Sequence, residues 1–172
     1  MLRIDLTRAE TEPLEFDERP VVPPAAGGED VVSVEPVRLA GRVERAGRGY
    51  LLEGEVAGAA KLRCVRCLTE FGFSFADRLD LHLVPLEAAP QEDETRLGRG
   101  DLEVRFYAEP HVDLAELAAE QFALAVPMKP LCAETCRGIC PRCGANLNQG
   151  ACACPPETDD RLAVLKDFRP SE

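Results

Sequence analysis

The chain of 172 residues is long enough for one domain with a small appendage, and its formal net charge of −11 makes it strongly acidic. This charge excludes a protein that coats nucleic acid or an anionic membrane over its whole surface, although a local basic face remains compatible with it. No apolar run approaches the roughly 20 residues of a membrane span, and the first residues lack the pattern of a secretory signal, so we expect a cytoplasmic protein.

Residues 1–36 are expected to form a short strand followed by an acidic, Pro-rich arm. Apolar and polar residues alternate over 2–6, which is typical of a strand. Residues 10–30 contain several prolines, a glycine pair and many acids. This composition favours an irregular linker, or an arm wrapped on the domain.

Residues 37–126 are predicted to form a β-rich domain. Strand patterns at 37–43 and 50–56 flank a glycine-rich turn. The clearest alternation runs over 71–83, where apolar side chains occupy odd positions, and it predicts a long strand or a tight hairpin with one buried side. Asp77 interrupts the apolar row, which is consistent with a bulge or turn there.

One main helix is predicted over 113–126, after a further strand at 101–106. Asp113 can accept hydrogen bonds from the free N–H groups of the first turn, and Glu116 three residues later completes a capping-box pattern. Pro127 ends the helix. Because strands and helices do not alternate along the chain, the sheet is not expected to be parallel.

The last segment, 127–172, is rich in cysteine and is expected to end in a short helix over 158–168. The chain has eight cysteines, and they form four close pairs. These are Cys64-x2-Cys67, Cys132-x3-Cys136, Cys140-x2-Cys143 and Cys152-x-Cys154. Disulfides rarely persist in the cytosol, so such spacing favours a metal or a redox role.

Four soft ligands at tetrahedral corners suit Zn²⁺, and two thiolates two residues apart can hold one edge of the tetrahedron. The Gly- and Asn-rich loop after Cys143 can bring the chain back to two further ligands, so we predict one site from Cys140, Cys143, Cys152 and Cys154, here called the knuckle centre. The unclaimed residues Cys64, Cys67, Cys132 and Cys136 would form a second site, the clamp centre, which pins the end of the helix to the sheet. The sequence thus predicts two Zn²⁺ ions and an α+β fold: a mainly antiparallel β-sheet or partly closed barrel with one main helix and a C-terminal zinc-knuckle tail.

Other interpretations of the cysteines remain open at this point. Cys136 could join the knuckle centre instead, and any of the thiols could be a buried apolar side chain. The Cys64–Cys67 pair could also be a redox pair. A thioredoxin-type pair normally sits where a strand feeds a helix, however, and strand-like residues follow here.

Basic residues concentrate in two segments, 37–67 and 127–154, despite the acidity of the whole chain. A clamp centre would bring these segments together, and a basic face beside metal knuckles could contact RNA phosphates. The candidate nucleic-acid contacts are Arg38, Arg42, Lys61, Arg63, Arg66, Arg137 and Arg142. Alternatively, these side chains form the polar side of an exposed sheet and pair with nearby acids.

Catalysis receives little support from the sequence. His82 and His111 are the only histidines, and both are more consistent with surface or packing roles. There is no Gly-rich phosphate loop, and a tetrathiolate zinc site leaves no open position for substrate. We therefore expect a protein that is not an enzyme.

The segments CVRCLTEF, PMKPLCAETCRGICPRCGANLNQGACAC and DDRLAVLKDF resemble the YceD family of bacteria and plastids. Members are called large ribosomal RNA subunit accumulation proteins, and the resemblance covers roughly residue 37 to the end. It implies a non-enzymatic factor that supports the synthesis, processing or stability of large-subunit ribosomal RNA. The cysteines match the family pattern position by position, which supports ligand roles.

The resulting hypothesis is a zinc-binding ribosome-assembly factor whose partner is large-subunit ribosomal RNA, a large-subunit ribosomal protein, or both. Two alternatives stay open. The protein could escort a ribosomal protein without touching RNA, or it could be a CxxC thiol oxidoreductase.

Overall fold

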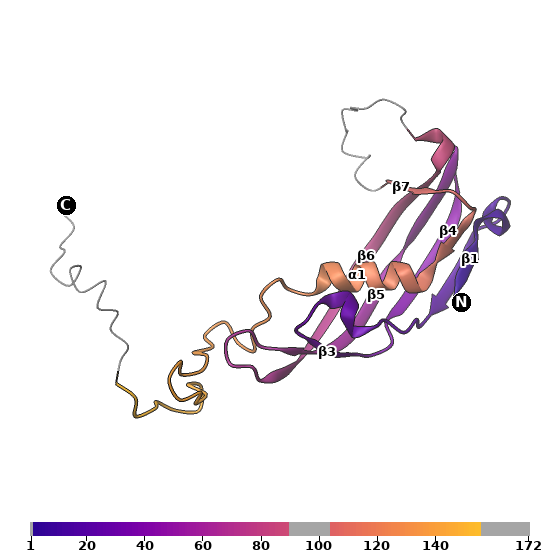
Figure 1. Ribbon diagram of the computed structural model, residues 1–172. Coiled ribbons are helices and arrows are strands. Elements are labelled where there is room, and N and C mark those ends of the chain that lie inside the picture. The colour runs from indigo at the N-terminus through magenta and orange to yellow at the C-terminus, as the bar shows by residue number, and fades with distance from the viewer. Residues whose placement is uncertain (1, 90–103, 156–172) are drawn as a thin grey trace, which may run out of the picture.

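The computed structural model describes residues 2–89 and 104–155, and these residues form a curved open sheet with one helix across it (Figure 1). The first five strands are β1 (Arg3–Asp5), β2 (Leu14–Glu18), β3 (Val31–Val34), β4 (Arg38–Ala46) and β5 (Gly49–Arg63). They are followed by β6 (Glu70–Pro85), β7 (Val104–Tyr107), β8 (His111–Asp113) and α1 (Leu114–Ala125). Short 3₁₀ turns occur at η1 (Leu6–Ala9), η2 (Pro24–Gly27) and η3 (Leu86–Ala88).

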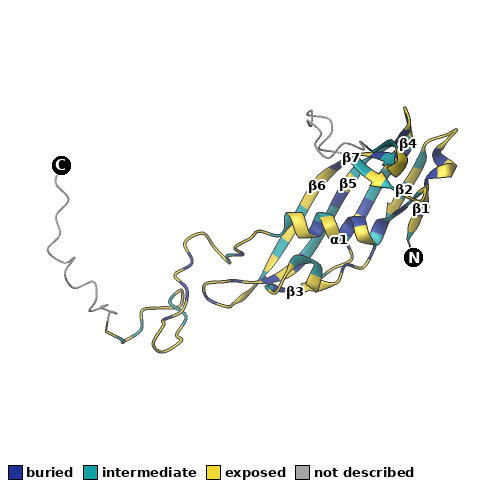
Figure 2. Cartoon of the chain, turned by 45° about the horizontal axis from the view of Figure 1, so that its top comes forward, coloured by how far each residue is buried: buried dark blue, intermediate teal, exposed yellow. Residues whose placement is uncertain are grey.

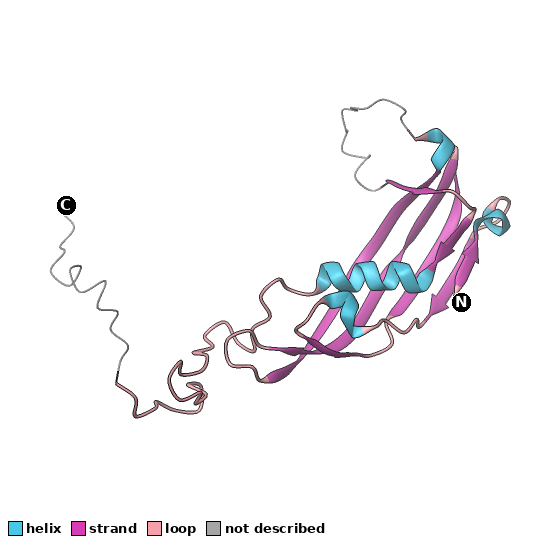
Figure 3. Cartoon of the chain, viewed as in Figure 1, coloured by secondary structure: helices cyan, strands magenta, loops and turns pink. Residues whose placement is uncertain are grey.

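The main sheet has the strand order β2-β4-β5-β6-β7, and β3 pairs with the far end of β5. All pairings in it are antiparallel except β6 with β7, and β1 pairs with β8 in a separate two-stranded sheet. The predicted α+β fold with a mainly antiparallel sheet is therefore confirmed (Figure 3). Within the described residues the sheet stays open, so of the two predicted forms it is the sheet and not the partly closed barrel that is found.

β5 and β6 form one long hairpin, which positions the first cysteine pair. Their register runs without interruption from Tyr50↔Leu83 to Arg63↔Glu70, and the loop that joins them carries Cys64 and Cys67. The predicted bulge or turn at Asp77 is wrong, because Asp77 pairs in register with Val56 inside the strand. An exposed carboxylate in the middle of the apolar row does not disturb the backbone ladder.

The N-terminal arm is more regular than its composition predicts. β2 pairs with β4, and β3 pairs with β5, so parts of the expected irregular segment belong to the main sheet. The sequence pattern of β2 is a short alternation whose inward residues, Leu14 and Phe16, are only half-buried. Such a short edge strand gives a weak signal, and pairing with β4 decides its conformation.

The core lies between the sheet and α1 (Figure 2). Phe122 is fully buried and its ring lies 5.8 Å from that of Phe75 on β6. Gly27 in η2 is required there, since a Cβ at this position would come within 2.6 Å of the Phe122 ring. Leu124, two residues further along the same helix, is 80% exposed.

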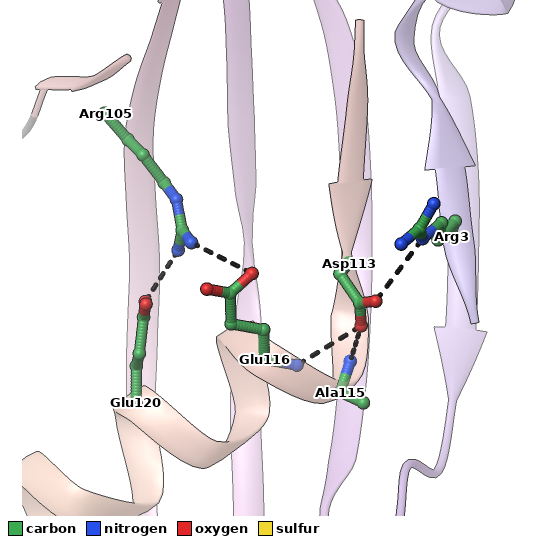
Figure 4. Close-up of polar contacts among 6 residues, drawn as sticks. All are labelled: Arg3, Arg105, Asp113, Ala115, Glu116 and Glu120. Atoms are coloured by element: carbon green, nitrogen blue, oxygen red, sulfur yellow. Dashed lines mark hydrogen bonds and ion pairs between the residues drawn. The ribbon is translucent and has the colours of Figure 1, made fainter. Parts of the chain in front are cut away.

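Asp113 caps α1 as predicted, and the contacts around it fix the helix on the sheet (Figure 4). Its Oδ1 accepts hydrogen bonds from the backbone N–H groups of Ala115 and Glu116, and its Oδ2 lies 3.4 Å from Arg3 Nε. The side chain of Glu116 does not close a capping box, but pairs with Arg105 on β7 at 3.5 Å. The predicted strand at 101–106 is described only from Val104 onward, and the predicted helix at 158–168 lies outside the described residues.

Candidate metal centres

The clamp centre joins the β5–β6 hairpin loop to the segment that follows α1. Cys64 Sγ lies 3.7 Å from Cys136 Sγ, and Cys67 Sγ lies 3.6 Å from Cys132 Sγ. All four sulfurs lie within 4.8 Å of one another. A tetrahedron with Zn–S bonds of ~2.3 Å has edges of about 3.8 Å, so the Cys64–Cys136 and Cys67–Cys132 separations match two edges of such a site.

The knuckle centre is a second group of the same kind. The sulfurs of Cys140, Cys143, Cys152 and Cys154 also lie within 4.8 Å of one another. The structure thus gathers the eight cysteines into two groups of four, with the membership that the sequence predicts. Both groups can hold a metal ion, while the identity of the ion and the ligand role of each sulfur stay predictions.

The two CxxC segments adopt the same turn, although one joins two strands and the other lies in the tail. In the hairpin loop, Cys64 N–H donates to Thr69 O at 3.0 Å, and Leu68 N–H donates to Cys64 O at 2.9 Å. In the tail, Cys140 N–H donates to Ala145 O at 2.8 Å, and Gly144 N–H donates to Cys140 O at 2.9 Å. Backbone N–H groups within each turn, those of Arg66 and Cys67 in the first and of Arg142 and Cys143 in the second, also donate to the sulfur of the first cysteine.

A left-handed residue follows the second cysteine of each turn. Gly144 has a φ of +71°, which glycine adopts without strain, and Leu68 has a φ of +61° at the equivalent position. A leucine there is unusual, because its Cβ crowds the following carbonyl. The shared hydrogen bonds hold Leu68 in this conformation.

The turns favour the thiolate form of their first cysteine. Burial opposes ionisation of Cys64, but hydrogen bonds from the backbone N–H groups of Cys132, Cys67 and Arg66 outweigh it and lower its pKa to about 6. Backbone N–H groups of Cys143 and Arg142 lower the pKa of Cys140 to about 6 in the same way.

One cysteine of each group, Cys132 in the clamp centre and Cys154 in the knuckle centre, behaves in the opposite way. The Cys132 thiol is hydrogen-bonded to the sulfur of Cys67, and this contact, with those to the sulfurs of Cys136 and Cys64, raises the pKa of Cys132 to about 12. The corresponding contact with Cys143 raises the pKa of Cys154 to about 12. Four thiolates so close together repel one another, so full ionisation of either group requires a cation among the sulfurs.

The clamp centre is largely shielded from solvent. Cys64, Cys67 and Cys136 are buried and pack against Phe71 and Leu131, while Cys132 is exposed. Further hydrogen bonds attach the segment after α1 to the hairpin loop. Val65 N–H donates to Pro130 O at 3.0 Å, and the Arg66 guanidinium donates to Cys136 O at 2.9 Å. These bonds hold the tail beside the tip of the sheet (Figure 1).

Side-chain donors to the sulfurs were not predicted from the sequence. Asn148 Nδ2 donates to Cys136 Sγ at 3.3 Å, and Thr69 lowers the pKa of Cys67 through hydrogen bonds from its hydroxyl and its backbone N–H. In the sequence, Asn146 and Asn148 indicate only the Asn-rich turn that follows Cys143. The signal that could have identified them is the presence of two amides at fixed short distances after a CxxC turn.

The seven candidate nucleic-acid contacts fall into two groups. Arg38 and Arg42 lie on β4, where they pair with Asp17 at 2.7 Å and with Glu53 at 2.8 Å. The other five lie at the metal end of the molecule: Lys61, Arg63, Arg66, Arg137 and Arg142. In the described residues no carboxylate lies within ion-pair distance of these five side chains, which we call the basic set.

The histidines lie apart from both cysteine groups. His82 is exposed on β6, and His111 on β8 has its Nδ1 3.4 Å from a carboxylate oxygen of Glu109. Neither side chain reaches a sulfur. Over residues 2–89 and 104–155, there is no helix with the length and hydrophobicity of a membrane span.

The fold and the cysteine groups define a small α+β protein with two tetrathiol sites that can hold metal ions. Residues 52–169 match the family described as "Large ribosomal RNA subunit accumulation protein YceD". The chain belongs to the YceD family, as its cysteine pattern predicted.

Similar proteins occur in bacteria and plants. An uncharacterized protein of Mycobacterium tuberculosis is 28% identical over 148 residues, which cover 84% of this chain and 69% of the relative. "Large ribosomal RNA subunit accumulation protein YCED homolog 1, chloroplastic" of Zea mays is 27% identical, over 79% of this chain and 52% of the relative. The protein of the same name in Arabidopsis thaliana is 27% identical, over 73% of this chain and 46% of the relative. No solved structure matches the chain.

Proposed function

We propose that the protein is a non-enzymatic, zinc-binding factor that supports the accumulation of large-subunit ribosomal RNA and ribosome assembly by contacting that RNA. The proposal is supported most directly by one juxtaposition: two tetrathiol groups lie beside a basic set without carboxylate partners in the described residues. Membership of the YceD family supports large-subunit ribosomal RNA as the partner, because the family is named for the accumulation of that RNA.

The donor sets fit Zn²⁺. Each group supplies four cysteine sulfurs. In the clamp centre, the sulfur–sulfur distances of 3.7 Å (Cys64 to Cys136) and 3.6 Å (Cys67 to Cys132) match the edges of a tetrahedral tetrathiolate site. When bound, the ion supplies a cross-link and a positive charge that keeps all four sulfurs ionised. Because four protein ligands close the coordination sphere, this role is structural rather than catalytic.

The zinc sites would serve the RNA contact by fixing where the basic side chains lie. Arg66 lies inside the hairpin turn of the clamp centre, Arg137 follows Cys136, and Arg142 lies inside the turn of the knuckle centre. The positions of these three arginines therefore depend on the conformation of the metal centres. Exposed cations of this kind bind phosphates by releasing counterions, so affinity should fall steeply with salt. Arg38 and Arg42 are less available, because Asp17 and Glu53 already accept their guanidinium N–H groups.

A filter-binding titration with large-subunit ribosomal RNA at several salt concentrations tests the RNA contact. Lys61→Glu with Arg63→Glu should weaken binding at least tenfold and flatten the salt dependence, because phosphate partners are lost. Arg38→Glu with Arg42→Glu is the charge-matched control and should weaken binding much less. Binding that ignores salt, or equal losses in the two double variants, would contradict a contact through the basic set.

A second candidate is the escort of a basic large-subunit ribosomal protein without RNA contact, and the net charge of −11 favours it. The two candidates differ in their response to nuclease. If ribosomal proteins stay bound to the immobilised protein after RNA digestion, the escort role is supported. If they are released, the partner is RNA.

A further inference from the structure

The loop of the knuckle centre contacts a sulfur of the clamp centre. Asn148 lies in the chain between Cys143 and Cys152, which belong to the knuckle centre. Its side-chain Nδ2 nevertheless donates a hydrogen bond to Cys136 Sγ of the clamp centre at 3.3 Å. A loop that one tetrathiol group closes thus contributes a donor to the other group.

The direction of this hydrogen bond is fixed by a second contact. The backbone N–H of Arg137 donates to Asn148 Oδ1 at 2.7 Å. A backbone N–H can only donate, so the amide oxygen must face Arg137 and the NH₂ group must face the sulfur. An aspartate at this position would keep the contact with Arg137 but would place a negative oxygen against a thiolate.

Asn146 reaches a second sulfur through one intermediate residue. Its Nδ2 donates to Thr69 Oγ1 at 3.3 Å, and the Thr69 hydroxyl hydrogen-bonds the sulfur of Cys67. Asn146 Oδ1 also accepts from the backbone N–H of Asn148 at 2.9 Å, which ties the two amides together. Two of the four clamp sulfurs therefore depend on groups ordered by residues 146–148.

The knuckle turn determines where residues 146–148 lie. Leu147 N–H donates to Gly138 O at 2.9 Å, and Asn146 forms an isolated β-bridge with Ile139. The Cys140 turn closes this loop through the bond from Cys140 N–H to Ala145 O. In the described residues no side chain from the clamp centre's loops donates to a knuckle sulfur, so the side-chain support runs from the knuckle loop to the clamp sulfurs.

We propose that the two metal centres are thermodynamically coupled through Asn148 and Asn146, so that metal bound at either centre strengthens metal binding at the other. Metal at the knuckle centre holds residues 144–151 in the conformation that donates to the clamp sulfurs. Hydrogen bonds to metal ligands orient them and stabilise their charged form, and their loss typically costs about 10- to 100-fold in metal affinity. The coupling is reciprocal by linkage. This inference rests on the proposed binding of metal by the two groups.

The test is a chelator titration of the full-length, zinc-loaded protein with a thiol-alkylating reagent present. Peptide mass spectrometry then reports the protection of each cysteine separately. The variants are Asn148→Ala, the isosteric Asn148→Asp, and Cys143→Ser, with Gln149→Ala as the matched control in the same loop. Circular dichroism checks that the sheet remains folded in each variant.

In the wild type and in Gln149→Ala, Cys64 and Cys140 should lose protection over the same range of chelator concentration. In Asn148→Ala, Cys64 should lose protection at about tenfold less chelator than in the wild type. Asn148→Asp should lower the required chelator concentration further, because it places a negative oxygen against the Cys136 sulfur. Cys143→Ser should reproduce the Asn148→Ala shift, and combining the two substitutions should add little.

Two results would overturn the coupling, and they are distinguishable. If the wild type binds two ions and Cys64 protection is unchanged in both Asn148→Ala and Cys143→Ser, the centres are independent, although metal binding itself stands. If the wild type binds no metal, both the coupling and the proposed zinc-binding role fail.

Discussion

Cys64 and Cys136 are separated by 72 residues in the chain, yet their sulfurs lie 3.7 Å apart. One sulfur belongs to the tip of the β5–β6 hairpin and the other to the segment after α1. Few apolar side chains pack where these two segments meet. In the described residues, the three buried cysteines of the clamp centre have only Phe71 and Leu131 packed against them. The attachment of the tail to the sheet therefore depends on the sulfurs and on what they bind.

Removal of metal is expected to release the tail while leaving the sheet folded. With a strong zinc chelator present, trypsin should cleave after Arg66 and Arg137 much faster than in the zinc-loaded protein. Cleavage after Arg78 should stay slow, because this residue lies within the β5–β6 ladder. Equal cleavage rates after Arg137 with and without chelator would show that the metal does not hold the tail.

The cap of α1 gives a prediction about pH. Backbone N–H groups of Glu116 and Ala115, together with Arg3, hold the pKa of Asp113 below its usual value (Figure 4). A carboxyl group with a lowered pKa in the folded state stabilises the protein above its unfolded pKa of ~3.9, and this contribution is lost as the pH falls through the folded value.

Asp113→Ala should therefore lower the free energy of unfolding by about 1 kcal/mol at pH 7. The difference from the wild type should shrink below about pH 4, as the wild-type carboxyl group becomes protonated. Urea unfolding at pH 7 and pH 3 measures both values. A loss of the same size at both pH values would mean that the charge of Asp113 contributes nothing.

The packing of α1 on the sheet can be tested with two residues of the same helix. Phe122→Ala removes a fully buried ring that contacts Phe75, so it should destabilise the protein by about 3–5 kcal/mol. Leu124→Ala changes a side chain that is 80% exposed and should stay within about 0.5 kcal/mol of the wild type. Similar losses in the two variants would contradict the observed orientation of the helix.

The shared turn of the two centres predicts opposite effects for two substitutions. Leu68→Gly relieves a left-handed leucine and should leave stability unchanged or raise it by up to about 1 kcal/mol, since the entropic cost of glycine offsets part of the gain. Gly144→Leu introduces the same strain and should weaken metal retention at the knuckle centre. The measurements are urea unfolding for the first and chelator competition for the second.

Local patterns predicted the elements whose signals are strong and short-range. The alternation over 71–83 predicted β6, and Asp113 predicted the start of α1, because these features depend on neighbouring residues alone. The division of the cysteines into two groups followed from the spacing of ligands within each pair. The position of β2, the exposure of Leu124 and the contacts of Asn148 depend on which distant segments meet, and no local pattern contains that information.

The basic residues illustrate the same limit. The sequence grouped Arg38 and Arg42 with the arginines of the metal end, because all of them lie in basic segments. The structure places carboxylates from β2 and β5 beside these two, while Arg63 and Arg137 lie at the other end of the hairpin. Pairing across strands therefore decides which cations are available, and it could not be inferred from charge along the chain.

The central claim is that the two tetrathiol groups each bind one structural zinc ion, and native mass spectrometry of the purified protein tests it most directly. We predict two zinc ions in the wild type and one in each of Cys64→Ser and Cys140→Ser, with the lost ion traced to the substituted centre by the reactivity of its remaining cysteines. A wild-type protein that is fully folded without bound metal would contradict the account.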